Sequence, residues 1–288
     1  TLAGDGALAL ARQVRLPTQS VGSFAALLAA LPGAGFDLLP GQAAAAAFAV
    51  PGAVVGRTVQ VANIDWALDL DELERAHGLG QSVCVNDFLA QAHGCRLLGE
   101  TARSVLPGDM DPTRIQAVIG AGTGLGHAAL VPLADGTCLA LASERGQTAA
   151  PFFGPQETAF ADFLCRATGE DYVRGDSVLS GFGLAQLHRF LTGQALAPEQ
   201  VSRQLTAESP TTALFARFYG RAARDYALAM LAAGGVYISG GVAAKNPLLA
   251  RHPEFAREFY ASRRYGEFLR AVGVRLVRDE DVGLYGAA

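Results

Sequence analysis

An apolar segment that runs directly into a glycine-rich loop constrains the fold of this chain more than any other feature. Residues 115–119 are predicted to form a buried strand, and glycine then occupies every second position from Gly120 to Gly126. Alternate glycines let backbone amides point toward an anion, and the hydroxyl of Thr123 adds a donor, so the pattern favours a phosphate cradle. On glycine spacing alone, a flexible β-hairpin is the alternative. A dinucleotide-binding loop is not favoured, because residues 127–132 are predicted to be a strand where that loop would open a helix.

Strand and helix patterns alternate in both halves of the chain, which indicates the α/β class. Further strands are predicted at residues 43–50, 81–85, 137–142, 236–239 and 274–278, and helices at residues 24–31, 70–77, 156–169, 183–192, 198–205 and 211–233. No low-complexity linker separates the halves, so we expect two packed lobes with a central cleft. The expected small lobe spans residues 1–98, with residues 279–288 returning to it, and the expected large lobe spans residues 99–278.

The second half begins with three predicted strands, joined by the glycine loop and by a hairpin turn at Asp135-Gly136. The first half contains only the later part of this pattern, a turn at Gly4-Asp5-Gly6 followed by an expected strand over residues 7–16. If the halves arose by duplication, a further strand and glycine loop are expected before Thr1. A second hairpin is predicted over residues 56–63.

Composition excludes several kinds of chemistry. Lys245 is the only lysine among 23 cationic residues, and no P-loop spacing surrounds it, which argues against a P-loop nucleotide site and a Schiff-base cofactor. The net charge of −4 and the scattered arginines argue against nucleic acid as a partner. The longest apolar stretch, residues 43–55, is interrupted by Pro51 and is too short to cross a bilayer, so no membrane partner is expected. The cysteines show no metal-ligand spacing and are predicted to be reduced, mostly buried thiols of a cytoplasmic protein; they are Cys84, Cys95, Cys138 and Cys165.

Polar or glycine pairs follow two of the predicted strands. Asn86 and Asp87 come directly after the strand at residues 81–85, where ligands of open α/β sheets gather. The carboxylate could serve as a general base or a ligand, with the asparagine amide beside it for a hydroxyl, and a helix cap is the alternative for this pair. Gly240 and Gly241 follow a later strand and are predicted to open a helix whose N-terminus could face a nucleotide, with a plain turn as the alternative.

Other polar residues give weaker signals. Glu144 and Asp176 lie at predicted element ends, where either could be a cap or a surface acid. The histidines form no metal-ligand spacing and are predicted to be surface or satisfied structural residues; they are His77, His93, His127, His188 and His252. No metal ligand is predicted from these residues.

Taken in chain order, these segments resemble the bacterial glucokinase family of the actin-like sugar kinases. The motifs that carry the resemblance span nearly the whole chain and are Asn63-Ile-Asp-Trp66, Val83-Cys-Val-Asn86-Asp87-Phe88, Ile119-Gly-Ala-Gly-Thr-Gly-Leu-Gly126, Ser143-Glu144-Arg-Gly146-Gln147, Asp176-Ser-Val-Leu-Ser-Gly181, Gly234-Gly-Val-Tyr-Ile-Ser-Gly-Gly241 and Gly283-Leu-Tyr-Gly286. One such motif could arise by chance, whereas the ordered set is highly specific. The resemblance implies a two-lobed, actin-like (ribonuclease H-like) α/β fold and ATP-dependent phosphorylation of a hexose, with glucose converted to glucose 6-phosphate.

The resemblance also implies roles for individual residues. Asp87 would take the proton from the sugar 6-hydroxyl as it attacks the γ-phosphate of Mg²⁺-ATP, and Asn86 would hold the far hydroxyls of the sugar. The other implied sugar ligands are Glu144, Gln147 and Asp176. The implied ATP ligands are Gly120, Gly122, Thr123 and Gly124 for the phosphates and Gly240 and Gly241 for adenosine. ATP and Mg²⁺ are the implied cofactors, and the analogy raises a homodimer as an assembly.

Three departures from the family pattern bear on function. The Asp-x-Gly-Gly-Thr-Asn loop that handles Mg²⁺ in the family does not occur in the sequence. Gln147 replaces the family histidine and Arg145 replaces a glycine, while Asp176 replaces a glutamate that is one methylene longer. Losing a buried partner to a substrate hydroxyl costs about 1–3 kcal/mol, so an altered choice of sugar is expected. A non-catalytic sugar- or nucleotide-binding homologue is the alternative function, and a transcription regulator is not supported because the sequence has no basic helix-turn-helix segment.

Overall fold

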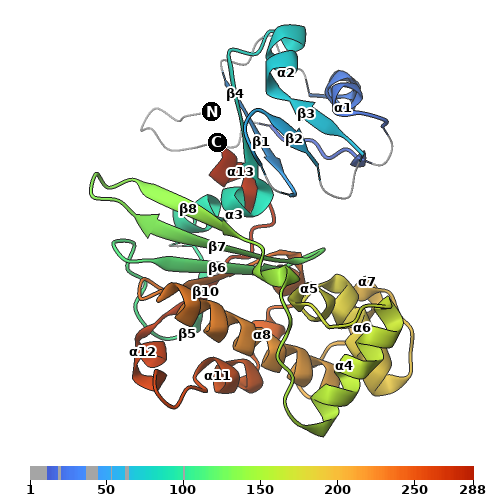
Figure 1. Ribbon diagram of the computed structural model, residues 1–288, viewed down its shortest axis with the longest axis vertical. Coiled ribbons are helices and arrows are strands. Elements are labelled where there is room, and N and C mark those ends of the chain that lie inside the picture. The colour runs from blue at the N-terminus through green and yellow to red at the C-terminus, as the bar shows by residue number, and fades with distance from the viewer. Residues whose placement is uncertain (1–11, 19–20, 37–44, 53, 62–64, 100) are drawn as a thin grey trace. The chain divides into compact units, whose positions relative to one another are not determined.

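The computed structural model describes residues 12–18, 21–36, 45–52, 54–61, 65–99 and 101–288 (Figure 1). The chain divides into two compact units. Unit 1 comprises Thr1–Gly94 and Asp281–Ala288, and unit 2 comprises Cys95–Glu280. The chain therefore crosses between the units twice, between Gly94 and Cys95 and between Glu280 and Asp281.

Unit 1 is built on two small sheets. Strand β1 (Ala45–Val50) pairs in parallel with β4 (Gln81–Asn86), and β2 (Thr58–Gln60) pairs antiparallel with β3 (Ala67–Asp69). The helical segments are α1 (Phe24–Ala30), a 3₁₀ turn at Pro32–Ala34, α2 (Leu70–His77), α3 (Asp87–Leu97) and α13 (Val282–Ala287). Helix α3 begins in unit 1 and ends three residues beyond the boundary, in unit 2.

Local sequence signals explain the ends of α2, which the sequence predicts over the same residues. The side chain of Asp69 accepts a hydrogen bond from the backbone N–H of Glu72 at 3.0 Å and so caps the first turn. Gly78 ends the helix with a φ of 61°, a left-handed conformation that glycine adopts without strain. Leu70 and Leu73 then face the small core of unit 1.

The core of unit 1 contains the single tryptophan of the chain. Trp66 is only 8% exposed and belongs to the same buried cluster as Val59 and Leu68. Phe24 on α1 and Phe48 on β1 meet edge to face, with their ring centroids 5.2 Å apart, at the margin of this cluster. Burial of these few side chains holds the two small sheets together with α1 and α2.

Unit 2 is built on a six-stranded mixed sheet with the order β5-β10-β9-β6-β7-β8. Its strands are β5 (Arg103–Leu106), β6 (Gln116–Ala121), β7 (Leu125–Pro132), β8 (Cys138–Ser143), β9 (Val236–Ser239) and β10 (Val274–Leu276). Strands β6, β9 and β10 are mutually parallel, and the remaining pairs are antiparallel. Every residue of β6 and β9 is buried, as expected for central strands that are covered on both faces.

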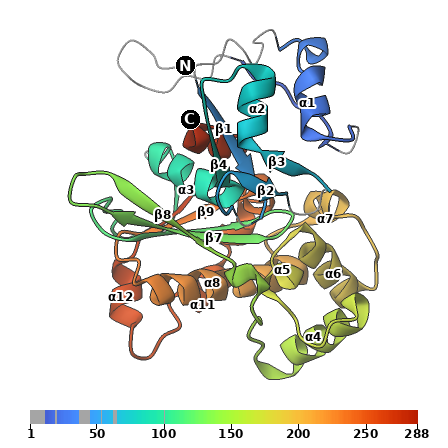
Figure 2. The ribbon, with the colours of Figure 1, turned by 45° about the horizontal axis from the view of Figure 1, so that its top comes forward.

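Helices supply most of the remaining core of unit 2. They are α4 (Gly154–Thr168), α5 (Gly175–Val178), α6 (Gly181–Thr192), α7 (Pro198–Gln204), α8 (Pro210–Met230), α9 (Gly241–Lys245), α10 (Leu248–Arg251), α11 (Pro253–Phe259) and α12 (Gly266–Ala271), together with a 3₁₀ turn at Arg145–Gln147. Helices α8 and α11 run side by side on one face of the sheet in both views (Figures 1 and 2). Phe215 and Tyr219 of α8 and Phe255 of α11 are fully buried there.

Several local predictions differ from the structure. Residues 12–16 form no strand, whereas residues 7–11 and the turn at residues 4–6 lie outside the described residues. The hairpin predicted over residues 56–63 is wrong, because β2 pairs with β3 and the N–H of Val61 donates to the Trp66 carbonyl at 3.0 Å. Strands of three residues are too short to show an alternating pattern.

The glycine loop is also shorter than predicted. Gly120 pairs with Gly126 across the antiparallel ladder, so β6 continues to Ala121 and β7 begins at Leu125. Only residues 122–124 form the turn between the two strands. The Gly283-Leu-Tyr-Gly286 motif, which the family resemblance implies to be a closing turn, lies within helix α13. Within the described part of the chain, no helix is long and apolar enough to cross a membrane.

Candidate active site

Asn86 and Asp87 lie at the junction between β4 and α3 in unit 1. The Oδ1 atom of Asn86 accepts hydrogen bonds from the backbone N–H groups of Phe88 at 2.9 Å and Leu89 at 3.2 Å. Its Nδ2 donates to the carbonyl of Gly52 at 3.0 Å. Asn86 therefore caps α3 and ties the helix start to a neighbouring turn. A helix cap, the alternative role predicted for the Asn86-Asp87 pair, is therefore confirmed for Asn86.

Asp87 is the first residue of α3, and its side chain is half-buried. Burial raises the pKa of its carboxyl above the ordinary aspartate value, and hydrogen bonds from its own backbone N–H and that of Phe88 offset this only in part. A carboxylate with a raised pKa is a better proton acceptor than an exposed one. The geometry around Asp87 is therefore suited to general-base chemistry.

The β6–β7 turn in unit 2 leaves open space above its backbone. The N–H of Gly122 donates to the carbonyl of Gly124 at 2.8 Å, and the carbonyl of Gly122 accepts from the N–H of Gly181 at 2.9 Å. A Cβ added at Gly122 would meet no atom within 4 Å. The side chain of Thr123 is exposed. The turn is thus held from one side by α6 and is free on the other.

The Gly240-Gly241 pair lies beside this turn. Strands β6 and β9 are parallel neighbours with Gly120 in register with Ser239, so the pair emerges at the same sheet edge as the turn. Gly240 has a φ of 87°, and a Cβ there would lie 2.5 Å from the Ala121 carbonyl oxygen, so no other residue fits without a backbone shift. A Cβ at Gly241 would meet no atom within 4 Å. The two glycine segments therefore form one open surface.

Three predicted sugar residues lie in two segments next to the same turn. Asp176 accepts through Oδ1 from the backbone N–H of Leu125 at 2.6 Å and through Oδ2 from Nε2 of Gln147 at 2.7 Å. A Cβ added at Gly146 would lie 2.2 Å from the Leu125 carbonyl oxygen and 2.5 Å from Oδ1 of Asp176, so glycine is required for this close approach. Glu144 is exposed, and its carbonyl accepts the N–H of Gln147 at 2.9 Å.

Arg174 also contacts this cluster, and the sequence does not predict it as a site residue. Its Nη1 donates to Oε1 of Gln147 at 2.5 Å, while its Nε and Nη2 donate to the carboxylate of Glu170 at 3.1 and 2.7 Å. Its position two residues before Asp176 was the only available signal. Nothing in a local pattern shows that the side chain turns back onto a residue 27 positions earlier.

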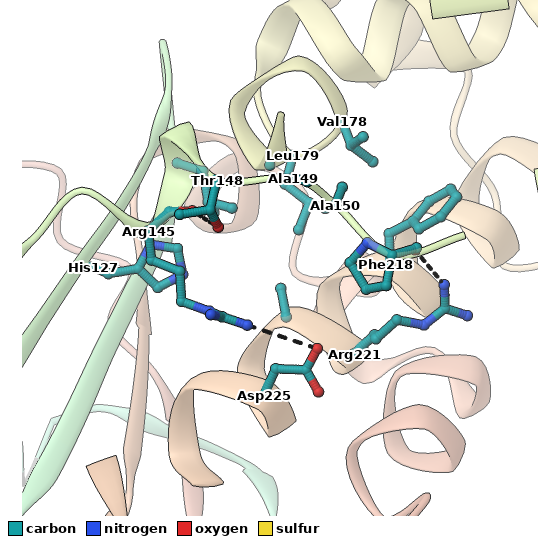
Figure 3. Close-up of a pocket in the computed structure, with 14 residues that line it drawn as sticks. His127, Arg145, Thr148, Ala149, Ala150, Val178, Leu179, Phe218, Arg221 and Asp225 are labelled. Carbon is teal, nitrogen blue, oxygen red and sulfur yellow. Dashed lines mark hydrogen bonds and ion pairs between the residues drawn. The ribbon is translucent and has the colours of Figure 1, made fainter. Parts of the chain in front are cut away.

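The same segments border a cavity of about 40 Å³, in which Nη2 of Arg145 lies 3.9 Å from Oδ2 of Asp225 (Figure 3). His127 also lines it and is only 2% exposed, and its Nδ1 has no hydrogen-bond partner among the residues that the structure describes. Burial and the nearby Arg145 charge lower the pKa of His127 to about 3, so the ring is neutral at pH 7. The prediction that this histidine is a surface or satisfied residue is wrong. The apolar residues that follow it in β7 signal a strand buried on both faces.

Comparison with known proteins decides the family. The family model named Glucokinase matches residues 12–288. The chain belongs to the glucokinase family. A glucokinase from Nitrobacter hamburgensis is 32% identical over 288 residues, which cover 93% of this chain and 87% of the relative. A glucokinase from Aromatoleum aromaticum is 34% identical over 255 residues, which cover 84% of this chain and 76% of the relative.

Solved structures of glucokinases share the fold. The crystal structure of a glucokinase from an Antarctic psychrotroph is 26% identical, has a TM-score of 0.75 and covers 94% of this chain and 86% of its own. A ROK family glucokinase from Streptomyces griseus, solved with glucose and AMPPNP, is 24% identical, has a TM-score of 0.57 and covers 92% of this chain and 85% of its own. The predicted α/β, actin-like sugar kinase fold is confirmed. As a member of the glucokinase family, the chain is a hexose kinase.

Proposed function

We propose that the chain transfers the γ-phosphoryl group of ATP to the 6-hydroxyl of glucose and releases glucose 6-phosphate and ADP. Membership of the glucokinase family and about 30% identity to glucokinases over most of the chain support this reaction. Asp87 in unit 1 is the proposed base, and two glycine segments in unit 2 are the proposed ATP ligands.

The main structural support for this function is the open surface around Gly122 and Gly241 in unit 2. The turn at Gly122, Thr123 and Gly124 would bind the ATP phosphates through the N–H groups of Thr123 and Gly124, because the N–H of Gly122 already donates to the Gly124 carbonyl. Gly240 and Gly241 would lie against adenosine. The supporting observation is that Gly122 and Gly241 stand at neighbouring strand ends and that a Cβ on either would occupy empty space. Neither glycine is required by packing, and the open space leaves room for a phosphate or an adenosine beside the backbone. Gly120, also expected to contact phosphate, lies in the β6–β7 ladder and would act through its position beside the turn.

Asp87 is the proposed general base. As the sugar hydroxyl oxygen bonds to the γ-phosphorus, the bond from that phosphorus to the bridging oxygen of ADP breaks, and the hydroxyl proton passes to the Asp87 carboxylate. The raised pKa of Asp87 favours this transfer. The Asn86 cap fixes the backbone at Asp87 and limits the search for the reactive orientation.

Sugar binding is proposed to involve Asn86, Glu144, Gln147 and Asp176. The cap uses the carbonyl oxygen of the Asn86 amide and one of its N–H groups, which leaves a single N–H for a sugar hydroxyl. Gln147 and Asp176 bond to each other, so a sugar hydroxyl must share these groups or displace one of the bonds. Glu144 is exposed, and its carboxylate can accept a hydrogen bond from a sugar hydroxyl.

Mg²⁺ neutralises phosphate charge when it accompanies ATP, and it is held by one or two carboxylates together with phosphate oxygens and water. Within the described ranges, no group of three or more His, Cys, Asp or Glu side chains could hold a metal ion. The side chains in these ranges therefore do not form a complete coordination site for Mg²⁺. Its ligands would be phosphate oxygens, water and at most isolated carboxylates.

The test is an ADP-release assay with a hexose panel on the wild-type chain and on Gly122→Ala and Gly241→Ala. We expect turnover with glucose, and a rise of about tenfold or more in the KM for ATP in each variant, because one methyl group enters the phosphate or adenosine surface. Melting temperatures should stay unchanged, since a Cβ at either position meets nothing.

Gly22→Ala is the matched control, because Gly22 also has open space around it and lies in unit 1. It should leave the KM for ATP unchanged. Absence of turnover with every hexose, despite measurable sugar binding, would instead support a non-catalytic homologue. A homodimer stays a proposal from family analogy, and light scattering on the purified chain tests it.

A further inference from the structure

Four groups in unit 2 form an unbroken line of hydrogen bonds from a surface arginine to the phosphate turn. Arg174 donates to Oε1 of Gln147 at 2.5 Å, Nε2 of Gln147 donates to Oδ2 of Asp176 at 2.7 Å, and Oδ1 of Asp176 accepts from the backbone N–H of Leu125 at 2.6 Å. The line crosses three separate segments: the N-cap and first turn of α5, the 3₁₀ turn and the start of β7. It therefore joins the proposed sugar residues to the proposed phosphate turn.

The donors and acceptors permit only one orientation of the Gln147 amide. The guanidinium of Arg174 can only donate, and the ionised carboxylate of Asp176 can only accept. The carbonyl oxygen of Gln147 must therefore face Arg174, and its NH₂ group must face Asp176. A flipped amide would place oxygen against oxygen at Asp176 and N–H against N–H at Arg174.

Arg174 is itself held firmly. Its two other donor atoms are bonded to the carboxylate of Glu170, four residues earlier in the sequence. Its backbone bridges to Ala149, and the N–H of the next residue, Gly175, donates to the carbonyl of Thr148 at 3.0 Å. Both the side chain and the backbone of Arg174 are thus fixed against the segment that carries Gln147.

We propose that Arg174 is a positioning residue for sugar binding and that it couples the sugar residues to the phosphate turn. This inference rests on the proposed function. By bonding the carbonyl oxygen of Gln147, Arg174 fixes the amide so that its NH₂ group faces Asp176 and keeps its second N–H for the substrate. The same orientation of the NH₂ group keeps the Asp176 carboxylate on the N–H of Leu125. In this way Arg174 fixes the turn that precedes β7.

A coupling of this kind acts in both directions. If sugar binding changes the hydrogen bonds of Asp176, the change reaches Leu125 and alters the affinity of the turn for nucleotide. By thermodynamic linkage, nucleotide must then alter the affinity for sugar by the same factor. Removing Arg174 frees the Gln147 amide to rotate, so both the sugar affinity and the coupling factor should fall.

The experiment compares Arg174→Met, Arg174→Lys and Arg257→Met with the wild-type chain. Methionine keeps the apolar stem and removes the donors, whereas lysine keeps one charged donor for Gln147 but cannot also bond Glu170 as a fork. Arg257 is the matched control, because it is another arginine of unit 2 that pairs with nearby glutamates, on α11, away from this line. The measurements are kcat, the KM for glucose, the melting temperature, and the Kd of a non-hydrolysable ATP analogue with and without glucose.

Arg174→Met should raise the KM for glucose about tenfold, the usual effect of losing one charge-assisted hydrogen bond, with kcat within about twofold. Its coupling factor should move toward one, and Arg174→Lys should restore part of both values. Arg257→Met should change neither. An unchanged KM and coupling factor in Arg174→Met would overturn the inference, and so would equal losses of kcat and melting temperature without a specific change in glucose affinity.

The Gln147→Glu variant provides a second, independent arm. A carboxylate at this position keeps the contact with Arg174 but repels Asp176, so the glucose KM and the analogue Kd should both rise. If the wild-type chain shows no turnover, the proposed function fails, and calorimetric binding of glucose to the same variants still decides the role of Arg174. If the wild-type chain turns over and Arg174→Met behaves normally, only this inference fails. A wild-type chain that neither turns over nor binds glucose would overturn both.

Discussion

Two aspartates, one in each unit, show how the same side chain can be prepared for different tasks. Asp176 in unit 2 has one oxygen on the Leu125 N–H and the other on the Gln147 amide. Asp87 in unit 1 is half-buried, and burial raises the pKa of its carboxyl despite its backbone hydrogen bonds. A carboxylate whose two oxygens are bonded in the fold acts as a clamp between segments. A carboxylate that is partly desolvated, with only local backbone donors, is better suited to accept a proton, which is the role we propose for Asp87.

The units also differ in how they support these residues. Asp176 lies on a segment of unit 2, which contains a six-stranded sheet. The large hydrophobic core of this unit includes Ile119, Phe160 and Ile238. Asp87 depends on one helix cap above a two-stranded parallel sheet and a much smaller core. Substitutions at the clamp should therefore disturb binding and structure together, whereas substitutions at the base should separate catalysis from stability.

The largest expected effect comes from Asp87→Asn. Loss of the proton acceptor should lower kcat by about a thousandfold. The melting temperature at pH 8 should rise, because the variant removes a carboxylate whose ionisation is disfavoured in the folded state. Steady-state kinetics and thermal unfolding measure both effects. Glu72→Gln on α2 is the control and should change neither, while near-normal turnover of Asp87→Asn would refute the assigned base.

A smaller but broader effect is expected for Gly146→Ala at the clamp. The new Cβ would lie 2.2 Å from the Leu125 carbonyl oxygen and 2.5 Å from Oδ1 of Asp176, so the 3₁₀ turn must move away. Overpacking of this kind costs about 1–3 kcal/mol and should lower the melting temperature by roughly 5 °C. The KM for glucose should rise in parallel. If the variant melts and binds glucose like the wild-type chain, the close contact between these segments does not exist in solution.

Asn86→Ala probes the cap beneath the base. Loss of an N-cap side chain costs about 1 kcal/mol, and the backbone at Asp87 also loses its tether to Gly52. We expect a lower melting temperature together with a reduced kcat. Ser23→Ala removes the cap of α1 in the same unit, where Oγ accepts from the N–H of Ala26 at 3.1 Å, and should destabilise to a similar degree without changing kcat. Equal kinetic losses in both variants would mean that α3 has no special role.

The smallest effect concerns the pH dependence of catalysis. Asp87 must be ionised to accept a proton, so activity should fall as the pH drops through its raised pKa. The acid limb of the kcat/KM profile should therefore lie above the ordinary aspartate value of about 3.9. Over the same range, the stability advantage of Asp87→Asn should be lost as the pH falls, because the protonated carboxyl carries no desolvation penalty. An acid limb at or below the ordinary value would contradict the difference between the two aspartates.

Local patterns predicted much of this fold because local forces determine it. Helix α2 has a cap at its start and a left-handed glycine after its end, and both signals lie within the helix and its immediate neighbours. Strand β9 is a mostly apolar run between glycines and occupies the predicted residues. By contrast, the pairing of β2 with β3 and the length of the glycine turn depend on partner strands, and a single-segment pattern does not contain that information.

The residues of the candidate site also fall into two groups, those that local patterns predict and those that depend on contacts between distant segments. The Asn86-Asp87 junction and the two glycine segments follow strand ends, so their positions could be predicted from the order of elements. The contacts of Asp176 with Leu125 and of Arg174 with Gln147 join residues 51 and 27 positions apart. Such contacts depend on how the loops fold back on the sheet. The exact partners of a polar side chain are therefore found only in three dimensions.

The position of Trp66 gives the molecule an optical label of its own. It is the single tryptophan of the chain, and it is buried in the core of unit 1. Fluorescence excited at the red edge of the indole band should therefore follow the unfolding of unit 1 alone, while circular dichroism is dominated by the helices of unit 2. Superimposable curves from the two methods would show that the units unfold together, and separated curves would give each unit its own transition.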